Sequence, residues 1–166
     1  MFRLHRPRCR PLEVATIAVV VALSVTACSG GGTPLGAKAF AKQANAQCAK
    51  LAAASEDLGL AQSEGAVGEE VQGYVEGAAD RLRDLAEGLA DLRPPESLES
   101  DAEELAAALG DYADGLDDIA ASVDPGQGLT EALDSSPKLV ARLNRLADRS
   151  SELVGVLGLD GCQLAG

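Results

Sequence analysis

Apolar residues recur at alternating spacings of four and three along residues 98–123, and this period constrains the fold more than any other feature of the chain. Side chains at this spacing share one face of an α-helix and form a continuous buried stripe. Pro94 and Pro95 predict the start of the helix, and the string Asp124-Pro125-Gly126 predicts its end. The stripe consists of Leu98, Ala102, Leu105, Leu109, Tyr112, Leu116, Ile119 and Val123.

Three further segments show a similar period, and no segment of the sequence alternates as a strand does. Residues 37–58 carry Phe40, Ala44, Cys48, Leu51 and Leu58, and residues 67–92 carry Val67, Val71, Tyr74, Ala78, Leu82, Leu85, Leu89 and Leu92. The last segment covers residues 129–157, where Ser136-Pro137 resembles a fresh N-cap and first helical residue and predicts a kink or break. We therefore expect an all-α fold, an up-down four-helix bundle joined by short loops.

The first 27 residues have the pattern of a secretion signal. Arginines at positions 3, 6, 8 and 10 precede an apolar stretch over residues 14–25. This stretch is shorter than the roughly 20 residues that a membrane-spanning helix needs. We therefore expect residues 1–27 to be a signal peptide that is removed from the mature chain.

The string Val25-Thr26-Ala27-Cys28 resembles the lipobox of bacterial lipoproteins. The resemblance implies that Val25, Thr26 and Ala27 are recognition positions and that Cys28 receives the lipid, after which the signal peptide is cut off. It thus predicts acylation by membrane lipid, palmitate included, and a lipid-anchored location on the extracytoplasmic face of the cell membrane. The alternative is an ordinary secreted protein, cut nearby, with Cys28 as a free thiol.

A Gly-rich segment follows the anchor, so we expect residues 28–36 to hold the lipidated cysteine and a flexible tether. The helical bundle domain would then comprise residues 37–166.

Removal of the signal sharpens what the composition excludes. The remaining 139 residues have 10 basic and 25 acidic side chains, a net charge of -15, and neither His nor Met. A charge of this sign argues against nucleic acid as a partner. Without His, the chain has no catalytic triad, no Cys-His dyad and no imidazole metal ligand. We therefore expect no cofactor and no metal site.

Two cysteines remain in the domain, Cys48 near its start and Cys162 near its end. Disulfides persist outside the cytoplasm, and an even pair without His fits a bridge better than a metal site. In an up-down bundle the end of the fourth helix lies beside the first, which would let the two cysteines meet. A redox-active pair is the alternative, but the chain lacks a Cys-x-x-Cys spacing or a base.

The mature region resembles a loose group of small exported proteins from high-GC Gram-positive bacteria. The shared strings are Asn45-Ala46-Gln47-Cys48, Leu92-Arg93-Pro94-Pro95 and Gly158-Leu159-Asp160-Gly161-Cys162, the last with one extra residue before the cysteine. The resemblance implies a disulfide-closed helical domain and implies no activity.

Charges are unevenly distributed along the domain. Between Pro94 and Pro137 there is no basic residue, whereas Lys138, Arg142, Arg145 and Arg149 form one stripe on the last helix. We expect this basic stripe to border the acidic third helix in surface ion pairs. The alternative is that it faces outward, toward anionic lipid headgroups or an anionic wall polymer.

The acidic run Asp111, Asp114, Asp117 and Asp118 invites comparison with a Ca²⁺ site. It fails the EF-hand spacing, and its apolar neighbours belong to the helical stripe. We interpret it as a solvated face. The three aromatic residues that follow the expected signal peptide, Phe40, Tyr74 and Tyr112, lie at stripe positions and are expected in the core. The alternative is that they line an apolar ligand pocket.

Three functions fit these features. The favoured one is a non-catalytic interaction or accessory module, tethered to the membrane, with an envelope protein as partner. The second is an envelope lipoprotein that binds a small ligand or cation. The third is an enzyme that uses carboxylates alone, such as a glycosidase, which needs two carboxyl groups facing each other across a cleft.

Overall fold

The structure, a computed structural model, describes residues 33–57 and 65–162. The expected signal peptide and the lipobox residues Val25, Thr26, Ala27 and Cys28 lie outside the described residues. Within these two ranges the fold is all-α, as predicted, and contains no strand. Its elements are α1 (Ala37–Asp57), α2 (Glu69–Ala90), a 3-10 turn η1 (Glu96–Leu98), α3 (Glu99–Ala121), α4 (Leu129–Ser135) and α5 (Pro137–Leu157).

The expected last helix is two helices, and the predicted break at Pro137 is confirmed. Short α4 ends at Ser135, and α5 begins with Pro137 at its first position. Proline fits there because its missing N–H has no partner inside the first turn of a helix. Ser136 occupies the N-cap position, but its side chain makes no capping hydrogen bond.

The start of α2 differs from the sequence prediction. The helix begins at Glu69, and the preceding Gly68 has a φ of 56°, in the left-handed region that favours glycine. Its amide donates to the carbonyl oxygen of Gln127 at 2.9 Å, which ties the start of α2 to the turn after α3. Val67 therefore lies before the helix and is 44% exposed, so its assignment to the buried stripe was wrong.

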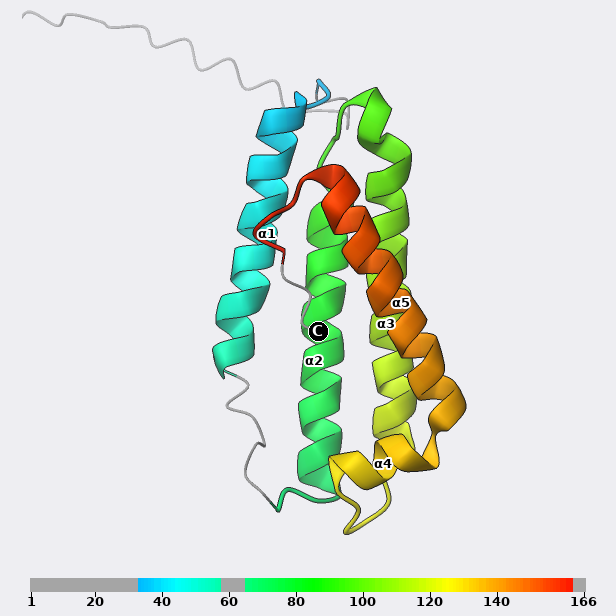
Figure 1. The fold of residues 1–166 in the computed structure, drawn as a ribbon. Helices are drawn as coiled ribbons and strands as arrows, with labels where there is room; N and C mark the ends of the chain where they lie inside the picture. The colour runs from blue at the N-terminus through cyan, green and yellow to red at the C-terminus, as the bar shows by residue number, and fades with distance from the viewer. Residues whose placement is uncertain (1–32, 58–64, 163–166) are drawn as a thin grey trace, which may run out of the picture. The chain divides into compact units, whose positions relative to one another are not determined.

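The helices pack around two apolar clusters. Helix α2 packs against α1 and α3, and α3 packs also against α5 (Figure 1). The first cluster joins Phe40 and Cys48 of α1 to the C-terminal half of α2, the N-terminal half of α3 and the end of α5. The second lies toward the α4 turn and contains Val71, Val75, Ile119, Ala120 and Leu143.

The packed part of the chain begins before α1. The Leu35 amide donates to the carbonyl oxygen of Arg93 at 2.7 Å, and the Leu35 side chain packs against the first cluster. The last residues of the segment expected to be tether are thus part of the domain, although α1 starts at Ala37 as predicted. Among the residues that the structure describes, no helix is both long and apolar enough to cross a bilayer.

Helices α3 and α5 are tightly packed at Gly115. A Cβ atom placed on this buried glycine would lie 2.6 Å from Cδ2 of Leu143 and 3.8 Å from Cδ1 of Leu139. One and a half turns earlier in the same helix, Gly110 has open space around the corresponding position. The packing against α5 therefore requires a glycine at position 115, whereas it leaves room for a larger residue at position 110.

We predict opposite effects from alanine at these two positions. Gly110→Ala should raise the free energy of unfolding by about 0.5–1 kcal/mol, because alanine loses less backbone entropy in a helix. Gly115→Ala should lower it by about 1–3 kcal/mol, because the methyl group overpacks the contact with Leu143. Urea unfolding of both variants provides the measurement. Stabilisation by both substitutions would show that the α3–α5 contact has room to spare.

Candidate interaction surface

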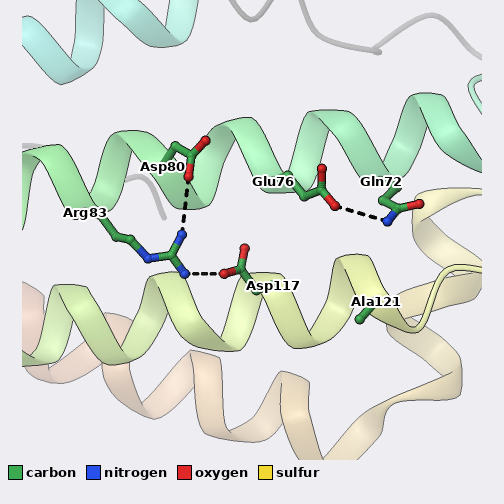
Figure 2. Close-up of a pocket in the computed structure, with 6 residues that line it drawn as sticks. All are labelled: Gln72, Glu76, Asp80, Arg83, Asp117 and Ala121. Atoms are coloured by element: carbon green, nitrogen blue, oxygen red, sulfur yellow. Dashed lines mark hydrogen bonds and ion pairs between the residues drawn. The ribbon is translucent and has the colours of Figure 1, made fainter.

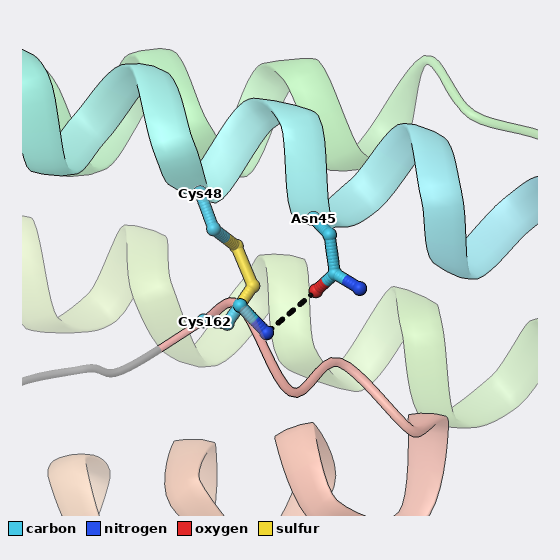
Figure 3. Close-up of a disulfide and its surroundings, with 4 residues drawn as sticks. Asn45, Cys48 and Cys162 are labelled. Atoms are coloured by element: carbon cyan, nitrogen blue, oxygen red, sulfur yellow. Dashed lines mark hydrogen bonds between the residues drawn. A yellow bond between two sulfur atoms is a disulfide. The ribbon is translucent and has the colours of Figure 1, made fainter.

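The predicted disulfide between Cys48 and Cys162 is present in the structure (Figure 3). The two Cα atoms are 5.0 Å apart across a sequence separation of 114 residues, and both side chains are buried. Beside the bridge, the side-chain oxygen of Asn45 accepts a hydrogen bond from the amide of Gly161 at 3.0 Å. A Cβ on Gly161 would lie 3.1 Å from that same oxygen, so the glycine permits the close approach.

The strings around Asn45, Leu92 and Leu159, on which the expected resemblance was based, lie in or beside the first cluster. Asn45 contacts Gly161, Cys48 is bonded to Cys162, and the preceding Leu159 is 1% exposed in the first cluster. Leu92 packs against the same cluster, and Arg93 accepts the hydrogen bond from Leu35. These residues therefore fasten α1 and the segments at Leu35 and Cys162 to the bundle, which is a structural role.

Arg149 fulfils the expectation for the basic stripe. Its Nε and one terminal nitrogen donate to the two carboxylate oxygens of Glu104 on α3, both at 2.7 Å, and its other terminal nitrogen contacts Glu152 at 2.6 Å. These charge-assisted hydrogen bonds lower the pKa of Glu104 and raise the pKa of Arg149 from their ordinary values. The fork therefore links α3 to α5 at the surface.

The other three members of the stripe do not border α3 as expected. Lys138, Arg142 and Arg145 are exposed. They form no ion pair with any acidic residue that the structure describes. The intervening Leu139 and Leu143 take up the inward face of α5, where they pack in the second cluster. The expectation that the basic stripe pairs with α3 was therefore wrong for these three residues, whose side chains are exposed to solvent.

The acidic run of α3 is only partly a solvated face. Asp114 contacts the guanidinium of Arg83 on α2 at 3.1 Å. Asp117 and Asp80 contact the same guanidinium, Asp80 at 3.3 Å (Figure 2). These partners, Asp117 foremost, raise the pKa of Arg83. Asp111 and Asp118 are exposed, as interpreted from the sequence.

A shallow groove of about 430 Å³ runs between α2 and α3 where Arg83 lies (Figure 2). Its lining is mostly polar and consists of Gln72, Glu76, Asp80, Arg83, Asp117 and Ala121. Gln72 and Glu76 are joined at 3.1 Å, so the polar groups of the groove largely satisfy one another. Within the described ranges no group of three or more Cys, Asp or Glu residues is placed to hold a metal ion.

None of the three aromatic residues lines this groove. Phe40 is 1% exposed in the first cluster, and Tyr74 and Tyr112 pack partly buried against the second. Burial raises the pKa of Tyr112. Core packing, the role expected from their stripe positions, is confirmed for all three.

Comparison with protein-family models, curated proteins and solved structures finds no match to this chain. The candidate site is therefore argued only from the residues of this chain. Its strongest feature is the outer face of α5, which carries three basic side chains in a domain of strongly acidic composition.

Sequence reasoning missed the clamp that Arg83 forms with α3. A signal for it was present, because Asp114 and Asp117 are one turn apart on one edge of the α3 stripe and Arg83 adjoins Leu82 on the α2 stripe. Only the pairing of the two helices in space supplies the register that brings these residues together.

The disulfide should contribute substantially to stability. Replacing both Cys48 and Cys162 by alanine should lower the free energy of unfolding by about 2–4 kcal/mol, because the bridge restricts a long loop in the unfolded chain. Urea unfolding with and without reductant tests this. The reduced wild type should match the double variant, and reductant should leave the variant unchanged. Equal stability of the oxidised wild type and the variant would contradict the prediction.

The Arg149–Glu104 fork should make stability depend on pH on the acid side. Because the folded pKa of Glu104 is lowered, its contribution is full above the ordinary carboxyl value of 4.5 and is lost as the pH falls through the lowered pKa. The melting temperature of Glu104→Gln should therefore lie below that of the wild type near neutral pH, and the two should converge in acid.

The neighbouring, exposed Glu103 provides the matched control for this pH series. Glu103→Gln removes the same charge from the same helix without touching the fork. A gap to the wild type as large as that of Glu104→Gln would attribute the effect to net charge instead of the fork.

Proposed function

We propose that this chain is a lipid-anchored, non-catalytic interaction or accessory module on the extracytoplasmic face of the cell membrane, with an envelope protein as its partner. The observation that carries the proposal is the lipobox-like string ending in Cys28, a few residues before a helical domain closed by a disulfide. A lipid anchor keeps the domain at the membrane, and a disulfide suits a compartment outside the cytoplasm.

The same proposal includes the finer topology of an up-down four-helix bundle built from α1, α2, α3 and α5. Its support is the composition of the two clusters and the order in which the helices pack. A bundle of this kind offers long helical faces and no deep cleft, which suits binding of a protein better than chemistry on a substrate.

The alternative, a carrier of a small ligand or cation, has less support. In the groove between α2 and α3, the guanidinium of Arg83 is already paired with Asp80 and Asp117, and Gln72 is paired with Glu76. A ligand would have to displace these partners. The surface of the bundle therefore remains the better basis for a function.

Anchoring is tested by Cys28→Ser in the native host. We expect the wild type in the membrane fraction, labelled by a clickable palmitate analogue, and the variant without label. Because the cut follows lipidation, the variant should also keep its signal peptide and have a larger mass than the mature wild-type chain. Serine is too weak a nucleophile to accept the lipid under these conditions, whereas the domain itself is untouched. Equal labelling of both proteins, or no label on either, would refute the lipid anchor at Cys28.

Partner binding is tested separately by cross-linking the wild type in its own membrane, followed by mass spectrometry. We expect one dominant envelope protein among the cross-linked species. Links only to further copies of the chain would count against an envelope partner and would favour self-association.

A further inference from the structure

We propose that the outer face of α5, formed by Lys138, Arg142 and Arg145, binds an acidic helical segment of the partner protein. This inference rests on the proposed function and names the chemistry of the partner. It requires that the three cations are available, that their spacing selects a helix, and that their surroundings disfavour a broad anionic surface.

The three cations are available. All are exposed and form no ion pair with the described residues, whereas Arg149 of the same helix is engaged by two carboxylates. Residues 135–147 contain no acidic side chain, so within this stretch α5 supplies no competing carboxylate. The three cations therefore form a local positive patch on a domain of net charge -15. An acidic partner would be attracted to this patch at short range.

The spacing fits a helical partner. Steps of four and three residues along α5 correspond to rises of about 6 and 4.5 Å, so the three charges form a line about 10 Å long on one helix face. A second helix with carboxylates at the same steps presents an equal line. Pairs of this kind set partner choice and orientation along the flanks of packed helices. The exposed residues between the cations are Ala141 and Asn144, which leave room for a close approach.

The surroundings disfavour a flat anionic membrane as the occupant. Asp134 and Asp148 lie beyond the two ends of the line and are exposed, so a broad anionic surface would meet them together with the three cations.

The test uses the full-length lipidated protein in neutral lipid nanodiscs and a fluorescent, alanine-based helical peptide with Glu at positions i, i+4 and i+7. We expect binding that weakens with added salt and that falls about tenfold or more in Arg142→Glu/Arg145→Glu. A peptide with Gln in place of Glu should not bind.

A matched variant, Lys38→Glu/Lys42→Glu, changes the net charge by the same amount on α1, where both lysines are exposed. It should bind the peptide nearly as well as the wild type. Equal losses in the two variants would attribute binding to net charge and overturn the proposal, as would unchanged binding in the α5 variant. Preferential, stripe-dependent binding to phosphatidylglycerol vesicles over the peptide would overturn it in favour of a lipid surface.

Cross-linking in the native membrane separates this inference from the proposed function. If the wild type and the α5 variant capture the same envelope protein equally well, the partner exists and the α5 face is not its site. If the wild type captures no envelope protein, the proposed function fails, while the peptide measurement still decides whether the face recognises acidic helices.

Discussion

The helices after α1 depend on the buried face of α3, which packs against α2 on one side and α5 on the other. Most of this face consists of small residues, namely Ala102, Ala108, Ala113, Gly115 and Ala120. Small side chains bring helix axes close together, so that contact between backbones and neighbouring leucines replaces the filling of space by large rings. Large rings can fill little of the core, because the domain contains only three aromatic residues. The core around α3 therefore depends on the close packing of its helices.

Much of this fold could be predicted from the sequence, because the period of a buried stripe follows from the local geometry of a single helix. All stripe positions of α3 are buried or half-buried, and the boundaries at Ala37 and Pro137 were predicted. The errors lie where the local period gives no information. Val67 continues the spacing but precedes a glycine with positive φ, and Leu35 is a lone apolar residue in a segment with the composition of a tether.

The charged surface was harder to predict for a related reason. The spacing of charged residues in the sequence shows which of them share a helix face. Whether they form ion pairs with another helix depends on how the two helices are rotated and spaced. Glu104 and Arg149 meet, as do Asp117 and Arg83, and each pair joins α3 to a different neighbour. Exposed pairs of this kind add little free energy, so their main effect is to favour one rotation of the helices over others. Lys138, Arg142 and Arg145 share the stripe of Arg149 but remain exposed and form no ion pair with the described residues.

The position of the disulfide also determines how the domain would respond to a pulling force. A lipid at Cys28 and a partner on α5 would be the two points between which tension develops. The chain from α5 continues through Leu159 and Gly161 to Cys162, and the bridge passes the tension directly to Cys48 in the middle of α1. From there only the first half of α1 leads back toward the anchor. Helices α2 and α3 lie within the loop closed by the bridge, so a pull on the anchor bypasses the small-residue contacts that hold them together.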